Sequence, residues 1–394
     1  MSPEELIGRV DALVRQYPIE TSDPRDFLEA RFDAGLAWVW AAPGEGGLGL
    51  DSTLQALVES RLAEKNAPLP FSYNPIGIGM TGPTLLAHGT AQQKSAYLRP
   101  LFSGREVWSQ LFSEPSVGSD VAGLATRARR DGDDWVVDGQ KVWTSWAHIA
   151  GRGLLLARTD PDVPKHAGLT AFVLDMTAPG VEVRPLRQMT GEAEFNEVYL
   201  VNVRIPDSDR IGEVGEGWRI ATTTLMNERF SLGGTMKRDT AEVGAEVLDA
   251  YRAAVDRGDH NPVRRDEAVR LWIEANVNNL IAERSAAATN RGRPGPEGSV
   301  LKLATAEYRK RAANFLVDLL GAPAMLVASY RMNRPRLPLG QEVPETTSAF
   351  LRSRANTIEG GTSEILRNIL GERVLGLPGD LRVDKGIPWR DIPR

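Results

Sequence analysis

The sequence predicts an α+β protein in which a middle antiparallel β domain separates an N-terminal helical domain from a C-terminal helical bundle. Up to about residue 105, apolar residues recur at helical spacing. Between 106 and 212, short β-type runs alternate with turn residues, and long helical patterns return from 213 onward. We therefore expect three domains, over residues 1–105, 106–212 and 213–394, the last resembling a four-helix bundle.

Composition narrows the possible functions. The chain has 394 residues, enough to bury a large core, and a net charge of -5, which argues against a nucleic-acid partner. It has no cysteine, and its four histidines lie far apart, so we expect no metal site. The N-terminus lacks a secretion signal, and no apolar run approaches the ~18 residues of a membrane span. We expect a cytoplasmic enzyme.

The first region begins with an amphipathic helix, in which Leu6, Val10 and Leu13 follow a Pro3 start. Residues 44–49 match the Gly-x-Gly-x-x-Gly pattern of dinucleotide-binding turns. That interpretation requires a strand before the glycines and a second strand after the following helix. No second strand follows, so we interpret residues 44–49 as a loop that connects helices.

The middle region contains short apolar runs typical of strands, and Val201, Val203 and Ile205 are expected to share one face of the last of them. The strand predictions cover residues 106–112, 135–137, 154–157, 169–173, 181–183 and 198–205. In the C-terminal region, the helix predictions cover residues 218–233, 237–257, 265–290, 299–320 and 350–375, with loops at 291–298 and 333–344.

Two stretches rich in small residues stand out. The first, residues 111–120, leaves a predicted strand and contains Ser113, Gly118 and Ser119. The second, residues 358–365, contains two adjacent glycines and opens a helical pattern. Small residues let backbone N–H groups approach a flat or anionic ligand, although an ordinary turn explains each stretch equally well when it is considered alone.

One acidic residue lies in an apolar helical stripe. At helical spacing, Glu228 shares a face with Ala221, Leu225 and Leu232. Burying a carboxylate is costly unless it is paired or its pKa rises. Glu228 is therefore either paired with an arginine or placed at the rim of the helix, or it is a general base in a dry pocket.

The chain resembles the acyl-CoA dehydrogenase family over nearly its full length. Four signatures carry the resemblance, and their order and separations make it specific. They are Ser-Glu-Pro at 113–115 with Gly-Ser-Asp at 118–120, Gly-Gln-Lys-Val-Trp-Thr-Ser at 139–145, Phe-Asn-Glu-Val at 195–198 with Val-Arg-Ile-Pro at 203–206, and Gly-Gly-Thr-Ser-Glu-Ile at 360–365.

The resemblance implies an FAD cofactor held between the β domain and the helical bundle. An indole suits a flat ring by offset stacking, which favours Trp143 as a flavin contact over an ordinary core tryptophan. Gly118 and Ser119 would bind the cofactor's phosphates, and Ser119 would also line the entrance for the substrate. The full cofactor set implied is Leu111, Phe112, Ser113, Gly118, Ser119, Trp143, Ser145, Gly321, Thr362 and Glu364.

The resemblance also implies an acyl-CoA substrate and α,β-dehydrogenation. Many relatives carry the base at the position of Gly360, which has no side chain here. In the branch that resembles isovaleryl-CoA dehydrogenase, the base comes from the helix that bears Glu228 and Arg229. We expect Glu228 to remove the α-proton while the β-hydrogen leaves as hydride to N5 of FAD, with Glu359 as the second candidate base. Arg229 and the Gly360 N–H would contact the substrate.

Reduced flavin is expected to pass its electrons to an electron-transferring flavoprotein. The family's Arg-x-Phe-Gly segment is absent near residues 257–272, and a segment that crosses between subunits is altered at 318–322. Three alternatives therefore stay open. The chain forms a homo-oligomer (tetramer or dimer), or it is one subunit of a heterotetramer with a paralogue, or the same scaffold serves a flavin oxidase or monooxygenase. The acyl group is not predicted.

Overall fold

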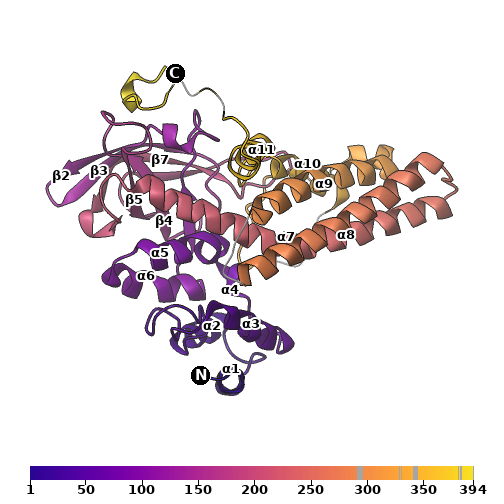
Figure 1. Ribbon diagram of the computed structural model, residues 1–394, viewed down its shortest axis with the longest axis horizontal. Coiled ribbons are helices and arrows are strands. Elements are labelled where there is room, and N and C mark those ends of the chain that lie inside the picture. The colour runs from indigo at the N-terminus through magenta and orange to yellow at the C-terminus, as the bar shows by residue number, and fades with distance from the viewer. Residues whose placement is uncertain are drawn as a thin grey trace.

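The computed structural model describes residues 1–394 except 291–295, 328, 330, 340–344, 380, 382–383 and 394, and except the side chains of 229–239, 286 and 288–290. Helices and strands separate in space as the sequence predicts. Short helices lie under one side of the β-sheet, and three long helices extend away from it (Figure 1). The α+β class and the helical, sheet and helical order are thus confirmed. The domain boundaries after 105 and 212 stay a prediction.

The N-terminal helices are short, and the first of them is capped by its own side chains. In α1 (Pro3–Gln16), Ser2 and Glu5 form a reciprocal capping box that pairs the first backbone N–H groups. Residues 44–49 form a turn between helices, so their interpretation as a connecting loop is confirmed. The other helical segments are α2 (Pro24–Asp33), η1 (Ser52–Leu54), α3 (Gln55–Glu64), α4 (Pro70–Tyr73), η2 (Gly77–Thr81), α5 (Gly82–His88) and α6 (Ala91–Ser103).

The sheet is mostly antiparallel, with strand order β6-β7-β3-β2-β4-β5-β8 and β1 paired in parallel with β4. One face packs on the N-terminal helices and the start of α7, and the other encloses a separate core with Leu111, Trp135 and Phe172. The strands are β1 (Trp108–Leu111), β2 (Arg127–Asp131), β3 (Asp134–Lys141), β4 (Arg152–Arg158), β5 (Leu169–Asp175), β6 (Val181–Pro185), β7 (Asn196–Pro206) and β8 (Arg210–Ile211).

The expected face pattern of the last long strand is wrong at Val201. The β3–β7 register shifts between Val137 and Gly139, and Asn202 has φ 50°. A bulge of this kind adds a residue and reverses which face the following side chains occupy. Val203 and Ile205 are consequently buried, whereas Val201 is exposed.

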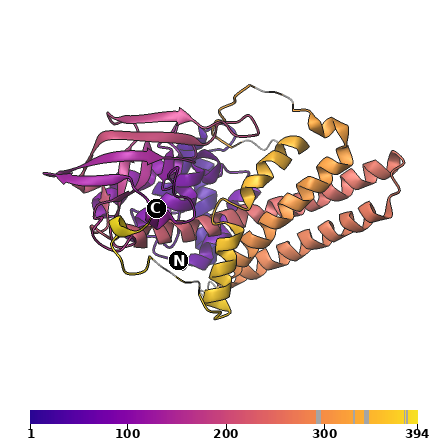
Figure 2. The ribbon, with the colours of Figure 1, turned by 90° about the horizontal axis from the view of Figure 1, so that it is seen from above.

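Two helix predictions in the C-terminal part are also wrong. One continuous helix, α7 (Gly217–Asp256), replaces the two expected over 218–257. The single helix expected over 350–375 is instead α10 (Thr346–Asn356), α11 (Ser363–Ile369) and the π-helical turn Leu370–Val374. Two further helices, α8 (Pro262–Asn290) and α9 (Glu297–Leu320), pack against α7, as Figure 2 shows from above.

Among the described residues, no helix combines the length and the apolar character that crossing a lipid bilayer requires.

Candidate active site

A buried ion pair anchors the first small-residue stretch. The Glu114 carboxylate accepts hydrogen bonds from the N–H groups of Ala125 (2.7 Å) and Thr126 (2.9 Å) and from Lys141 Nζ (2.9 Å). Lys141 is fully buried and also donates to the Phe112 carbonyl at 3.0 Å. The loop after β1 is therefore bound to β3 by a charged side chain inside the fold.

The surroundings of Glu114 favour its ionised form. Burial raises the pKa of the Glu114 carboxyl, but the Lys141 ammonium and the N–H donors together outweigh burial and hold that pKa below its ordinary value. A carboxylate whose charge is matched by three donors is a rigid anchor. The adjoining backbone at Ser113 is consequently fixed relative to the sheet.

The Trp143 indole is open to solvent. It is 57% exposed, so the alternative of a core tryptophan is wrong. Its φ of 58° is unusual for a residue with a side chain, and such conformations gather at functional sites. The Phe195 ring meets it edge-on, with centroids 5.6 Å apart.

The residues expected around the flavin ring lie together. Val142 N–H donates to the Ser113 carbonyl at 3.0 Å, and Ser109 Oγ donates to the Ser145 carbonyl at 2.8 Å. These bonds hold the segment that carries Trp143 and Ser145 against β1 and the residues that follow it.

The rest of the first stretch divides into a buried part and an open part. The side chains of Leu111 and Phe112 point into the core, so only their backbone groups can meet a ligand. Gly118 and Ser119 are exposed, and a Cβ added at Gly118 would meet no atom within 4 Å. This open side of the loop has room for a phosphate-bearing ligand.

The second small-residue stretch is the turn between α10 and α11. Gly360 and Gly361 have φ of 62° and 95°, a conformation that favours glycine. The Lys302 ammonium, on α9, donates to the carbonyls of Asn356 (3.0 Å) and Gly361 (2.7 Å). Within the described part of the chain, no acceptor is recorded for the Gly360 N–H. Lys302 therefore fixes the turn to α9, and the Gly360 N–H stays available as a donor to a ligand.

Arg352 connects this turn to the indole. Its guanidinium donates to both oxygens of Glu359, at 3.2 Å and 2.9 Å, and lies 6.0 Å from the centre of the Phe195 ring. Asn356 Nδ2 donates to the same carboxylate at 2.9 Å. The contacts from Glu359 through Arg352 and Phe195 reach Trp143, so the two distant stretches approach each other across the interface between sheet and bundle.

Sequence reasoning missed three members of this cluster: Lys302, Arg352 and Glu194. Burial and the neighbouring Glu359 and Glu192 raise the pKa of the Glu194 carboxyl, although Arg352 opposes the rise. Lys302 and Glu194 act on segments far away in the chain, and Arg352 joins the nearby Glu359 to the distant Phe195, so local spacing alone did not reveal the cluster. A charged residue inside a helical pattern was the one signal available for Lys302 and Arg352.

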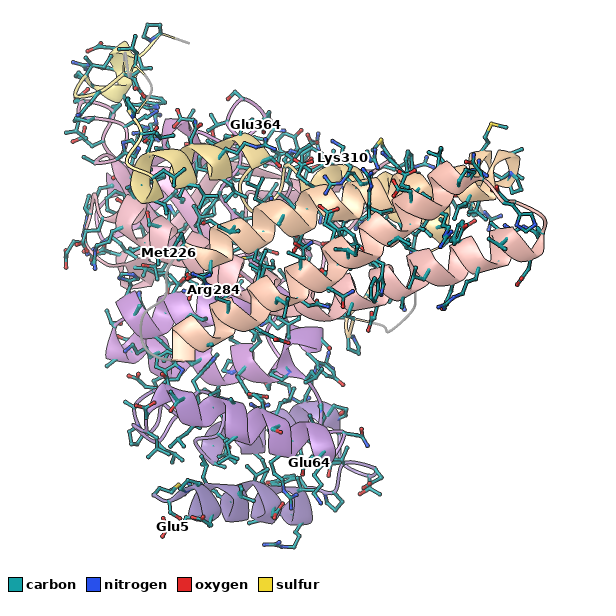
Figure 3. The ribbon with its side chains drawn as sticks, turned by 45° about the vertical axis from the view of Figure 1, so that its right-hand side comes forward. Glu5, Glu64, Met226, Arg284, Lys310 and Glu364 are labelled. Atoms are coloured by element: carbon teal, nitrogen blue, oxygen red, sulfur yellow. The ribbon has the colours of Figure 1, made fainter. Side chains whose placement is uncertain are left out.

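Thr362 and Glu364 lie at the start of α11, and Gly321 lies elsewhere. Thr362 Oγ1 caps the helix by accepting from Ile365 N–H at 3.2 Å. Glu364 is exposed on the first turn of α11 (Figure 3), and backbone N–H groups lower its pKa. Gly321 ends α9, about 28 Å along that helix from Lys302 at 1.5 Å per residue. The structure therefore does not bring Gly321 to Thr362 within one chain.

Glu228 occupies the part of α7 that faces the N-terminal helices. One turn earlier, Thr224 is fully buried and shares a hydrogen bond of 3.0 Å with Thr84 of α5. Ala221 is fully buried as well, whereas Met226 is exposed and marks this part of α7 in Figure 3. Glu228 itself is half-buried, at the border between the packed and exposed sides. The side chains of Arg229 and Leu232 lie outside the described residues.

Comparison with known proteins identifies this arrangement. Residues 8–105, 109–203 and 215–375 match the N-terminal, middle and C-terminal domain models of acyl-CoA dehydrogenases. The chain is 40% identical over 88% of its length to acyl-CoA dehydrogenase FadE34 of Mycobacterium tuberculosis, although it spans only 45% of that relative. It is 38% identical to acyl-CoA dehydrogenase IpdE1 of the same organism, covering 89% of this chain and 86% of the relative.

A solved structure extends the likeness to the fold. The Tcur3481-Tcur3483 steroid ACAD superposes with a TM-score of 0.71 at 26% identity, over 96% of this chain and 97% of that one. Three matched domains, in order, and a relative at 38% identity along most of its length leave one conclusion. The chain belongs to the acyl-CoA dehydrogenase family, whose members are FAD-dependent oxidoreductases.

Proposed function

We propose that this chain dehydrogenates an acyl-CoA thioester between Cα and Cβ, with Glu228 as the base. The observation that supports this most is the exposed Trp143 indole, held at φ 58° between the anchored loop and the Gly360 turn. An aromatic surface left open at the meeting point of both motifs is what a flat cofactor requires. Few other roles explain an indole held open in a strained conformation.

The residues present suit FAD. The backbone of Leu111, Phe112 and Ser113, with Trp143 and Ser145, would line the ring, and the open side of Gly118 and Ser119 would admit the phosphates. Thr362 and Glu364 would meet the cofactor from the bundle side. FAD, when bound, supplies the hydride acceptor for the β-hydrogen.

The chain's own groups would perform the proton chemistry. Glu228, half-buried on α7 near the N-terminal helices, would take the α-proton. The Gly360 N–H, which has no recorded acceptor in the described residues, would donate to the thioester oxygen as negative charge develops there. Arg229 would order the base or the pantetheine arm.

Glu359 suits the role of base less well. Both of its oxygens accept from Arg352, and Asn356 donates to one of them. A carboxylate whose two oxygens are both bound by side chains of the adjoining α10 is placed to support its own turn rather than to meet a substrate. We assign Glu359 to the scaffold of the turn.

The substrate is proposed to be a bulky, polycyclic acyl-CoA. The support is the steroid ACAD named among the similar solved structures, at 26% identity and nearly full coverage. An electron-transferring flavoprotein is the proposed electron acceptor.

Heteromeric assembly is the second candidate, and one observation favours it: that same structure is named as a pair of chains. The distance of Gly321 from Thr362 also suits a residue that serves the cofactor of a second subunit. In this case the FAD site is complete only when the chain is assembled with a paralogue.

The test is the variant Glu228→Gln, which keeps shape and removes the base. General-base removal is expected to slow anaerobic flavin bleaching by steroid-type acyl-CoA about 10²- to 10⁴-fold, with the oxidised flavin spectrum unchanged. Glu359→Gln is the comparison variant: it removes a carboxylate that supports the turn but leaves the proposed base, so it should bleach much faster than Glu228→Gln. Equal bleaching by Glu228→Gln and wild type would remove Glu228 from the mechanism.

A further inference from the structure

The end of the chain returns to the sheet. Beyond residue 375, where the C-terminal family model stops, the described residues 384–392 lie against the loop over 160–166. Trp389 N–H donates to the Val163 carbonyl at 2.9 Å, and Arg390 N–H donates to the Pro161 carbonyl at 3.1 Å. Figure 1 shows this last turn beside the strands, far from the outer ends of the long helices.

The Trp389 side chain covers a buried arginine. Its indole Nε1 donates to the Gly123 carbonyl at 3.0 Å, and the Arg158 guanidinium lies 4.2 Å from its ring centre. Arg158 is 2% exposed. It donates to the carbonyls of Ala122, Leu124 and Lys165. Trp389 and Arg158 together therefore hold the backbone of residues 122–124 by three carbonyls.

Lys165 joins residues 384–392, the C-terminal tail, to the same loop at a point closer to Ser119. Lys165 Nζ donates to both oxygens of Asp120 at 2.8 Å, and it also pairs with Asp384 of the tail. Burial lowers the pKa of Lys165, but the two carboxylates outweigh it and raise that pKa overall. Asp120 directly follows Ser119, so this bridge ends beside the open part of the loop.

The loop is thus held at two ends with its open part between them. On one side, Glu114 is bound to Lys141 inside the fold. On the other, residues 120–124 are bound to Arg158, Lys165 and the tail. Gly118 and Ser119 lie between the two anchors, and a Cβ added at Gly118 would meet none of the described atoms within 4 Å. A loop held in this way does not have to be ordered when a ligand binds.

We propose that residues 384–392 form a clamp that positions Gly118 and Ser119 for a phosphate-bearing ligand, either the pyrophosphate of FAD or the phosphates of CoA. The inference rests on the proposed function for the identity of that ligand. Trp389 is a positioning residue, because it acts through the carbonyls of the loop and through Arg158 and touches no reacting atom.

The test compares Trp389→Ala with Arg390→Ala in the full chain. Arg390 is the matched control, because it belongs to the same tail but its side chain pairs with Asp162 and Asp391, which are exposed. The dissociation constant of FAD is measured by flavin fluorescence on the apoprotein, and KM and kcat for acyl-CoA are measured at saturating FAD. Losing preorganisation in Trp389→Ala should weaken one of the two ligands about tenfold while kcat stays near wild type.

The two arms identify the ligand. A raised FAD dissociation constant assigns the clamp to the cofactor, and a raised KM with unchanged FAD binding assigns it to CoA. Trp389→Phe, which keeps the stacking on Arg158, should recover part of the loss. Trp389→Ala that matches Arg390→Ala in both arms overturns the clamp.

Two further controls keep the outcomes apart. If Trp389→Ala fails to fold, Asp384→Asn removes the charge of the second anchor alone, and unchanged FAD affinity and KM in that variant overturn the proposal. If wild type binds FAD but no acyl-CoA bleaches it, the proposed function fails while the FAD arm still tests the clamp.

Discussion

At the scale of single residues, the Glu114–Lys141 pair is the strongest constraint on the site. Lys141→Met would leave a buried carboxylate without its cation, and such losses cost about 3–5 kcal/mol. We expect the free energy of unfolding, measured by urea denaturation, to fall by that amount. Glu114→Gln combined with Lys141→Met should recover much of it, because no buried charge remains. A loss below about 1 kcal/mol in the single variant, the value typical of surface pairs, would contradict this account.

The same carboxyl gives the fold an acid sensitivity. The folded pKa of Glu114 lies below its unfolded value of about 4.3. Its contribution to stability is therefore complete above that unfolded pKa and is lost as the pH falls through the folded pKa. Glu114→Gln should lower the melting temperature at neutral pH and show a shallower decline than wild type as the pH falls below about 4.3. Parallel melting curves for both proteins in that range would rule out Glu114 as the source.

Single residues also show how far sequence reasoning reaches. Trp143 could be singled out because the motif around it is contiguous and an indole has few roles. Lys141 stood in that same motif, yet its partner lies 27 residues away, and no local spacing connects them. The same holds for Arg352 and Phe195, which meet from different domains. Chemistry carried by neighbours in sequence was predictable, and the scaffold behind it was not.

At the scale of elements, α9 supports the turn that bears Gly360. Lys302→Met would leave the Asn356 and Gly361 carbonyls without this donor, at about 1–3 kcal/mol for each unsatisfied group. We expect a loss of about 2 kcal/mol or more of unfolding free energy and a lower kcat, since the turn carries the proposed thioester donor. Urea denaturation and anaerobic bleaching measure the two effects. Lys302→Arg keeps the charge, so its unfolding free energy and kcat should lie between those of Lys302→Met and wild type. Wild-type values for Lys302→Met in both assays would contradict a supporting role for Lys302.

Helices and strands could be predicted where the hydrophobic pattern of the sequence is strong. Strands β4 and β5 are nearly continuous apolar runs, and both were expected. Strand β2 was missed because Ala128 is its one buried residue and charged residues fill the rest. Helix α7 was expected to break after Gly233, and it continues because tertiary packing against α8 and α9 outweighs the cost of glycine. The break between α10 and α11 was missed because the glycine turn lies within a helical period.

At the scale of the whole molecule, α7 unites the parts. Ile220 and Ala221, near its start, belong to the core shared by the N-terminal helices and the sheet. Val247, near its end, belongs to the core of the bundle with α8 and α9. Glu228 lies between these two cores, so the relative placement of sheet and bundle determines where the proposed base stands. Any rearrangement of the bundle would be transmitted to the site along this one helix.

Helix α8 has an apolar side that the described residues of the chain leave exposed. Ala268, Leu271 and Ala275 face the bundle core. The opposite side exposes a stripe at helical spacing, formed by Val269, Trp272, Ile273, Val277 and Leu280. A helix that is apolar on two sides is typical of one buried on both, and an exposed stripe of this kind marks an interface between subunits. We therefore expect the chain to associate, with itself or with a paralogue, through α8.

Charges in the stripe should separate the subunits. In Trp272→Glu combined with Leu280→Glu, association would bury two unpaired carboxylates, which is strongly unfavourable. Light scattering after size exclusion should then give the mass of a single chain, whereas Val201→Glu, an equally exposed position on the sheet, should keep the wild-type mass. If the chain expressed alone is already a monomer, co-expression with a paralogue should give a complex that the double variant cannot form. An unchanged mass for the double variant in both settings would move the interface away from α8, and the distance between Gly321 and Thr362 would then need another explanation.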